Sequence, residues 1–122
     1  MGLDMYASIT AERFDTDVDF TPTGDVHELF YWRKHPDLHG WMEQRYRLKG
    51  GKEQVFNCAR LKLDHNDLNE LECAIRHRRL PKTAGFFFGE SDGSEIQDDL
   101  DFIAKARGAL AQGYTLFYDS WW

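Results

Sequence analysis

The chain has 122 residues, of which 42% are hydrophobic, 15% aromatic and 30% charged, and its formal net charge is −6. This length suits a single domain covering residues 1–122, and it is sufficient to bury a core without disulfides or structural metals. Nine phenylalanines, five tyrosines and four tryptophans, against three prolines, exclude a disordered tail, a collagen and a coiled coil.

Charge is distributed unevenly along the chain. Residues 1–30 hold seven acids and one arginine, residues 31–82 hold twelve basic residues and seven acids, and residues 83–122 hold two basic residues and seven acids. The basic middle could hold an anion or pair with the acidic ends, and solvated helix faces explain most patterns of this kind. The acidic total argues against general nucleic-acid binding, which needs a dominant basic face.

The two cysteines are too few for a disulfide framework. Cys58 and Cys73 each lie in a periodic segment, where we expect small buried side chains. The opening Met-Gly-Leu-Asp-Met-Tyr has neither a basic nor an apolar signal region, and no apolar run approaches the roughly 18 residues of a membrane span. We therefore expect a cytoplasmic protein in a reducing compartment, without membrane contact.

The first half of the chain predicts two strands and a helix. Strict alternation of apolar and polar residues predicts a half-buried strand over 3–13, and residues 15–25 read as a loop. An aromatic-rich strand follows over 27–33. Pro36 suits the first turn of a helix, which Gly50 and the glycine after it would end.

Alternation predicts a third strand over 53–63. Asp64 is a predicted N-cap for a helix over 65–79, whose last turn would carry three arginines against the helix dipole. Residues 85–89, Gly-Phe-Phe-Phe-Gly, are too short for a helix between two glycines and predict a buried strand.

Ser94 and Gln97 have the spacing of a capping box, and the helix behind them would end at Gly113. A last strand is predicted over 114–118. The predicted order is β-β-α-β-α-β-α-β, an α+β domain with one mixed sheet of about five strands and three α-helices.

His35 and His39 are four positions apart, a spacing that places two zinc ligands on one helix face. Pro36 puts His35 at the helix entrance, and no third ligand lies nearby in sequence. Cap and surface roles are therefore favoured over a metal site, and neither a metal nor a cofactor is expected.

Nucleophilic catalysis is not expected either. Neither cysteine begins a helix, where a thiolate would be stabilised, and no Gly-x-Ser-x-Gly elbow is expected in the chain. Residues 89–94 precede a helix N-terminus that could hold an anion, but they lack the P-loop lysine, and Glu90 and Asp92 would repel phosphate. A solvated, capped turn is favoured there, and no catalytic residue is assigned.

Acidic residues concentrate at the start of the last helix, where they complement the helix dipole. The sharper alternatives are a magnesium site or a mimic of an acidic partner. The residues are Asp92, Glu95, Asp98, Asp99 and Asp101.

The candidate ligand-binding surface lies at the predicted strand-to-helix junction. Arginine offers a fork for carboxylate or phosphate, and tryptophan offers a stacking face. The candidate residues are Tyr31, Trp32, Arg33, Lys34, His39 and Trp41, joined by Phe86 and Phe88. Trp121 and Trp122 are candidate interface residues, because two adjacent tryptophans are more aromatic surface than a chain end needs.

Four segments together resemble a family of small proteins from bacteria and their phages: MGLDMY at the start, ELFYWRKHPDLHGWM (28–42), LPKTAGFFFG (80–89) and YDSWW at the end. The function of that family is unknown. The resemblance implies a cytosolic accessory protein carried by a phage or prophage, and it transfers no catalytic residue.

Three functions are weighed. The favoured one is a non-enzymatic phage-type protein that binds a host protein or sequesters a small anionic, nucleotide-like ligand, for example to inhibit antiviral defence. The first alternative is a metal-assisted hydrolase of a phosphorylated ligand, using His35 or His39 with the acidic turn. The second is a structural module that forms a homo-oligomer through Trp121 and Trp122.

Overall fold

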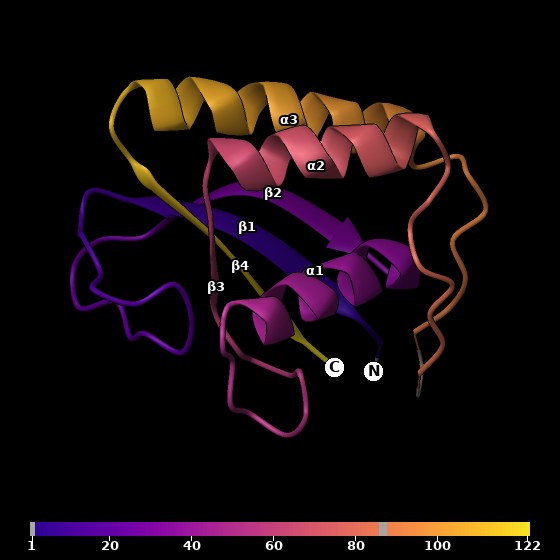
Figure 1. Cartoon of the computed structure of the whole chain (residues 1–122), viewed down its shortest axis with the longest axis horizontal. Helices are drawn as coiled ribbons and strands as arrows, with labels where there is room; N and C mark the ends of the chain where they lie inside the picture. The colour runs from indigo at the N-terminus through magenta and orange to yellow at the C-terminus, as the bar shows by residue number, and fades with distance from the viewer. Residues whose placement is uncertain (1, 86–87) are drawn as a thin grey trace.

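A computed structural model describes residues 2–85 and 88–122, and it confirms an α+β fold. In chain order the elements are β1 (Asp4–Thr10), β2 (His27–Arg33), α1 (Pro36–Leu48), β3 (Leu61–Leu63), α2 (His65–Arg76), α3 (Ile96–Ala111) and β4 (Thr115–Trp121). Figure 1 shows β1 and β4, from opposite ends of the chain, side by side within the sheet. None of the helices in the described ranges is both long and apolar enough to cross a membrane.

The strands form one sheet in the order β2-β1-β4-β3, and every neighbouring pair is antiparallel. The prediction of a mixed sheet of about five strands was therefore wrong in the described part of the chain, which has four strands. β4 is longer than the predicted strand over 114–118, because its pairing with β1 continues until Trp121 lies opposite Asp4.

Of the predicted strand over 53–63, only Leu61–Leu63 form a strand, β3. Cys58 adopts a left-handed backbone with φ of 60°, which an extended strand cannot contain. The side chain of Asn57 instead bonds to the backbone of Trp122, donating to its carbonyl at 2.7 Å and accepting from its amide at 3.1 Å. The alternation in sequence is real, but this long-range contact turns the segment into a loop.

The predicted strand over 85–89 is not present at the positions that can be described. Gly85, Phe88 and Gly89 lie outside any strand, and Phe86 and Phe87 lie outside the described residues. Gly89 has φ of 75°, a left-handed conformation that glycine adopts readily and that ends an extended run.

The helix caps were predicted with mixed success. Asp64 caps α2 as expected, through a capping box in which Asp64 and Asp67 exchange side-chain and backbone bonds. The helix ends at Arg76 instead of reaching 79. The Ser94–Gln97 capping box was wrong, because Glu95 directly precedes α3 and its carboxylate turns back to accept from the amides before it.

The two cysteines are exposed free thiols, so the expectation of buried side chains was also wrong. Cys58 lies in the loop that replaces the predicted strand, and Cys73 lies on the solvent side of α2.

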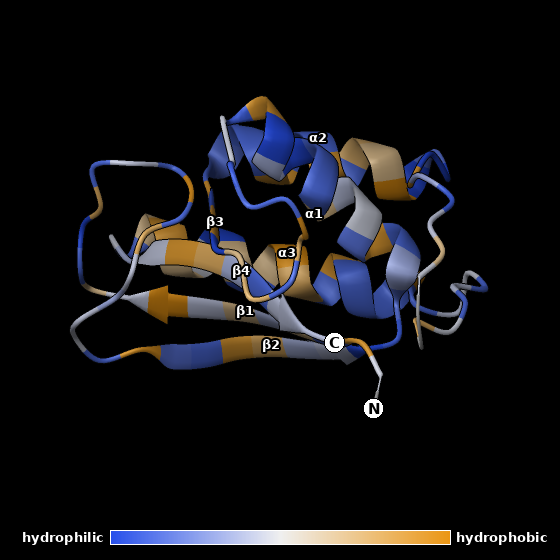
Figure 2. Ribbon diagram, turned by 90° about the horizontal axis from the view of Figure 1, so that it is seen from below, coloured by the Kyte–Doolittle hydropathy of each residue, from blue (hydrophilic) through white to orange (hydrophobic). Residues whose placement is uncertain are grey.

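All three helices cover one face of the sheet, as Figure 2 illustrates. That face presents alternate residues of each strand, and Trp32 from β2 meets Phe102 of α3 while Tyr118 from β4 meets His39 of α1. On the opposite face, the loop between β1 and β2 covers part of the sheet, where Phe20 packs edge-on against Phe117. The helix-covered face holds the main core and positions the site described next.

Candidate functional site

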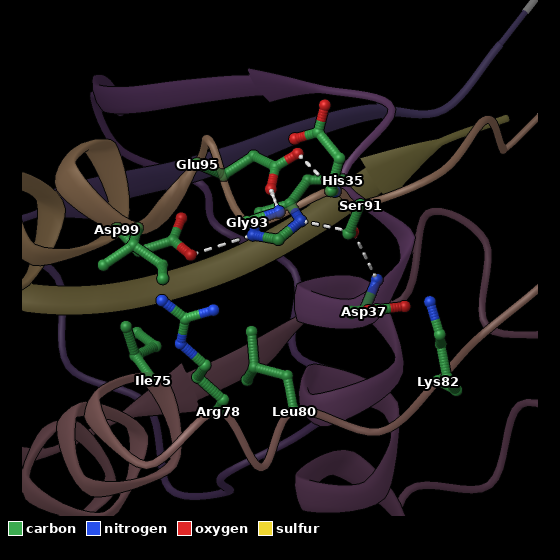
Figure 3. A pocket seen from close by; sticks show the side chains of 12 residues that line it. His35, Asp37, Ile75, Arg78, Leu80, Lys82, Ser91, Gly93, Glu95 and Asp99 are labelled. Carbon is green, nitrogen blue, oxygen red and sulfur yellow. Dashed lines mark hydrogen bonds and ion pairs between the residues drawn. The ribbon is translucent and has the colours of Figure 1, made fainter.

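A pocket of about 330 Å³ opens where three helix ends converge. Its walls come from the start of α1, the residues that follow α2, and the loop that leads into α3 (Figure 3). This volume lies at the lower end of the range for small-molecule sites, about 300–1,000 Å³.

A chain of hydrogen bonds crosses one wall of the pocket. His35 Nδ1 lies 2.7 Å from Ser91 Oγ, and His35 Nε2 lies 2.8 Å from Asp99 Oδ2. The imidazole and the carboxylate are almost fully buried, with side chains 4% and 2% exposed. Ser91 is partly exposed and lines the cavity, so the network connects the protein interior to solvent through the serine.

The Asp99 carboxylate is held from two sides. Trp32 Nε1 donates to Oδ1 at 3.1 Å, and His35 occupies Oδ2. Burial raises the pKa of Asp99, while the bonds from His35 and Trp32 oppose that shift. When the Asp99 carboxylate is ionised it only accepts hydrogen bonds, which assigns the imidazole proton to Nε2 and leaves Nδ1 to accept from the serine hydroxyl.

The Ser91 hydroxyl also meets the N-terminus of α1. The Asp37 amide donates to Ser91 Oγ at 3.1 Å, and the His35 side chain makes no cap of its own. With Oγ accepting from this amide, its own proton is free to point at Nδ1 of the imidazole. The positive end of a 13-residue helix dipole therefore faces the oxygen atom.

Sequence reasoning missed the serine, histidine and aspartate as a group, and the expectation that the chain has no Gly-x-Ser-x-Gly segment was wrong. Residues 89–93 read Gly-Glu-Ser-Asp-Gly, the Gly-x-Ser-x-Gly spacing of hydrolase nucleophiles. Both glycines take left-handed backbones, Gly89 with φ of 75° and Gly93 with φ of 90°. The context differs from the strand-to-helix elbow, because Ser91 follows a loop and not a strand.

Arg78 enters the pocket from the end of α2 through a strained turn. Its φ is 53°, at the position after the helix cap where glycine is the usual residue. The turn is a Schellman motif, in which the Arg78 amide donates to Ile75 and the Arg79 amide donates to Ala74. A left-handed arginine costs on the order of 1 kcal/mol, and such strain concentrates at functional positions.

Lys82 reaches the same cavity from the segment after α2, and Figure 3 shows both cations extended along it. Each carboxylate of the pocket already accepts hydrogen bonds from protein donors. Asp37 accepts from the Thr83 amide, and Asp92 accepts from Ser94. Glu95 accepts from the Asp92 and Gly93 amides, and Asp99 accepts from Trp32 and His35. In the described part of the chain, the side chains of Arg78 and Lys82 have no hydrogen-bond acceptor or ion-pair partner. Arg78 and Lys82 are therefore the cations available to an anion, in a lining that also holds the four carboxylates of Asp37, Asp92, Glu95 and Asp99.

The surface predicted from 31–41 is divided between the two faces of the sheet. Tyr31 is 44% exposed on the open face, where its hydroxyl donates to Asp4 at 2.6 Å. Arg33 lies on the same face and pairs with Asp4 at 3.4 Å. Lys34 is exposed at the turn into α1, with φ of 56°. The alternation of a strand separates these residues from Trp32, which is 5% exposed and faces the helices.

The remaining predicted residues lie in the core. His39 is 1% exposed and Trp41 is 8% exposed, with the Arg45 guanidinium 4.7 Å from the indole ring centre. Phe88 is buried and meets His39 edge-on, whereas Phe86 lies outside the described residues. Of the whole predicted set, Trp32 alone touches the pocket network through a described hydrogen bond.

Trp121 and Trp122 have different environments. Trp121 is 69% exposed at the end of β4. The indole of Trp122 packs edge-on against Phe88, and its Nε1 donates to the Phe56 carbonyl at 2.9 Å. Only the first of the pair is therefore largely available to a partner.

The predicted surface role of the two histidines was wrong, since both side chains are buried. His35 occupies the N-cap position of α1, but its side chain makes no capping hydrogen bond. The zinc-type spacing does not bring ligands together, because the ring of His35 bonds to Ser91 and Asp99 while His39 bonds to Tyr118. Among the residues that the structure describes, no group of three or more histidine, cysteine or acidic side chains is arranged to hold a metal ion.

Comparison of the chain with protein-family models, with curated proteins and with solved structures finds no match.

Proposed function

We propose that this protein binds a small anionic ligand in the pocket between the ends of α1, α2 and α3. Arg78 and Lys82 supply the positive charge, and the carboxylates around them are occupied by protein donors. The observation that carries the proposal is the left-handed Arg78, whose backbone is strained at the position that directs its side chain into the cavity.

The chemistry of the pocket favours a phosphate or carboxylate. A guanidinium binds either group with two parallel hydrogen bonds, while an ammonium adds a point charge. A cavity of about 330 Å³ suits a ligand about the size of a nucleoside monophosphate.

The test uses a substitution that relieves the backbone strain at Arg78 and also removes its charge. Arg78→Gly removes the guanidinium and relaxes the turn, so we expect the free energy of unfolding to rise by about 1 kcal/mol. Calorimetric titration with inorganic pyrophosphate and adenosine monophosphate should show at least tenfold weaker binding for Arg78→Gly and for Lys82→Ala.

Arg79→Ala is the matched control, because Arg79 is also exposed, is adjacent in sequence and does not line the pocket. Its affinity should equal that of the wild type. Binding that is unchanged in Arg78→Gly, or weakened equally in Arg79→Ala, would show that the anion binds by general surface charge and would refute the proposal.

The wider role remains a proposal from the family resemblance: a phage-type accessory protein that sequesters a nucleotide-like ligand or contacts a host protein. An interface at Trp121 and Trp122 stays a prediction, for which the exposure of Trp121 offers support.

A further inference from the structure

We propose that Ser91 is a catalytic nucleophile, with His35 as its general base and Asp99 orienting the imidazole, for acyl transfer from esters that carry an anionic group. The anionic part of this substrate class rests on the proposed function of Arg78 and Lys82. The nucleophile itself rests on separate observations, which are the hydrogen-bond geometry and the exposure of the serine.

Three features distinguish this network from a buried structural one. The serine is at the cavity wall, so a substrate carbon can approach its oxygen. The base is within 2.7 Å of that oxygen, inside the reach required for proton transfer. The base is in turn fixed by a carboxylate at 2.8 Å, which matches the nucleophile, base and orienting acid of serine hydrolases.

The imidazole is reversed relative to the common serine triad. Nδ1 faces Ser91 and Nε2 faces Asp99, whereas the usual arrangement places Nε2 on the serine. Both nitrogens are chemically competent as bases, so the relay works in either orientation. His35 itself lies at the entrance of α1, as its N-cap residue.

The reaction balances without a cofactor. Ser91 Oγ attacks the ester carbonyl carbon as its proton moves to Nδ1, and the tetrahedral adduct expels the alcohol, which takes that proton. Water then attacks the acyl-serine and gives a proton to Nδ1, and Oγ leaves with that proton to release the acid. The sum is ester plus water giving acid plus alcohol.

The structure also supplies positive potential where negative charge develops. The Asp37 amide donates to Oγ at 3.1 Å, so the N-terminus of α1 favours negative charge on the serine oxygen itself as its proton leaves, and the cations Arg78 and Lys82 line the same pocket. The same cations would hold a carboxylate or phosphate elsewhere in the substrate. The two parts of the site therefore act on different groups of one molecule.

The first experiment measures the reactivity of Ser91 without involving anion binding, by covalent labelling with the neutral reagent diisopropyl fluorophosphate. Attack by Oγ forms an O–P bond and expels fluoride. Intact mass and peptide mapping should show one equivalent on Ser91 in the folded protein, and none in Ser91→Ala or in unfolded chains. His35→Gln, checked for folding by its thermal transition, should slow labelling at least 100-fold.

Ser94→Ala is the matched control, since this exposed serine lies three residues away and donates to Asp92 outside the triad. It should be labelled at Ser91 as fast as the wild type. No labelling at Ser91, or labelling no faster than at Ser94 or in unfolded chains, overturns the nucleophile.

A second experiment separates the two proposals. Arg78→Gly should lower kcat/KM for p-nitrophenyl hemisuccinate at least tenfold more than it lowers kcat/KM for neutral p-nitrophenyl acetate, while Arg79→Ala, outside the pocket, should change neither. Anion binding without Ser91 labelling would retain the proposed function and overturn the nucleophile. Labelling with equal effects of Arg78→Gly on both esters would support the nucleophile and overturn the anionic substrate class.

Discussion

His35 and His39 lie one helical turn apart at the start of α1, and both are buried, yet they have opposite surroundings. The ring of His35 bonds to a serine at the wall of a pocket and to a carboxylate behind it. The ring of His39 lies among aromatic side chains, with Phe56 at 4.9 Å and Phe88 at 5.2 Å between ring centres. Its Nδ1 meets the Tyr118 hydroxyl at 2.7 Å.

The difference shows that the partners of a buried histidine, more than its burial, decide what it can do. Without a charged partner, burial lowers the pKa of His39 from 6.5 to about 4, so this ring is neutral under physiological conditions. His35 instead has a carboxylate that can stabilise an imidazolium formed during proton transfer. One histidine completes the core, and the other is able to accept and return a proton.

The largest effect on stability is expected from substituting Asp99, the buried acid that bonds to His35. Asp99→Ala removes the acceptor of two buried donors, from His35 and Trp32, and should lower the free energy of unfolding by about 3–5 kcal/mol. Urea denaturation measures this loss. Asp98→Ala, an exposed acid in the same helix, should change stability by less than about 0.5 kcal/mol, and a comparable loss there would refute a specific role for Asp99.

The next largest effect is the pH dependence of stability that the buried His39 causes. Because the pKa of His39 is lower in the folded chain than its ordinary value, the unfolded chain binds a proton first as the pH falls. Its contribution to stability is thus complete above pH 6.5 and declines as the pH falls toward 4, by about 3 kcal/mol in total. Urea denaturation of the wild type should show about 2 kcal/mol of this loss between pH 7 and pH 5.

His39→Gln removes the titrating group and should flatten this part of the pH dependence, whereas His35→Gln should retain it. An unchanged pH slope in His39→Gln would mean that other groups, and not this ring, cause the acid lability.

The helices and the long strands were predictable from the sequence because their signals are local. Pro36 and Asp64 mark helix starts, and the aromatic-rich run over 27–33 predicts β2 with its observed bounds. The strand over 53–63 failed because its backbone is directed by the chain end, through the bonds between Asn57 and Trp122.

The candidate site was much less predictable than the fold. Ser91 and Asp99 lie 56 and 64 positions from His35, so no spacing in the sequence relates them to it. The predicted surface failed to assemble for a local reason, since strand alternation sends Trp32 and Arg33 to opposite faces. The Gly-x-Ser-x-Gly spacing was the one usable signal, and its expected structural context is absent.

A smaller effect is expected at the close contact between α1 and the loop that carries Lys82. A Cβ on Gly40 would lie 1.9 Å from Thr83 Oγ1, in the loop that carries Lys82. Gly40→Ala should therefore displace this loop and cost about 1–3 kcal/mol, measured by urea denaturation.

The same substitution at Gly108 of α3 is the matched control, because nothing lies within 4 Å of its added Cβ. There, alanine should stabilise the helix by about 0.5–1 kcal/mol. If alanine at Gly40 and alanine at Gly108 changed the free energy of unfolding in the same direction, the tight contact at Gly40 would be contradicted.

The smallest effects come from removing one hydroxyl beside each histidine. Tyr118 is fully buried, so Tyr118→Phe leaves Nδ1 of His39 without its hydrogen-bond partner in the aromatic core and should cost about 1–2 kcal/mol. Ser91→Ala should cost less than about 1 kcal/mol, because pocket water can replace the hydroxyl at His35 and at the Asp37 amide. Paired urea denaturation curves compare the two variants. If Ser91→Ala were the more destabilising, the hydroxyl would serve the fold as a helix cap, because a serine kept for reaction contributes little to stability.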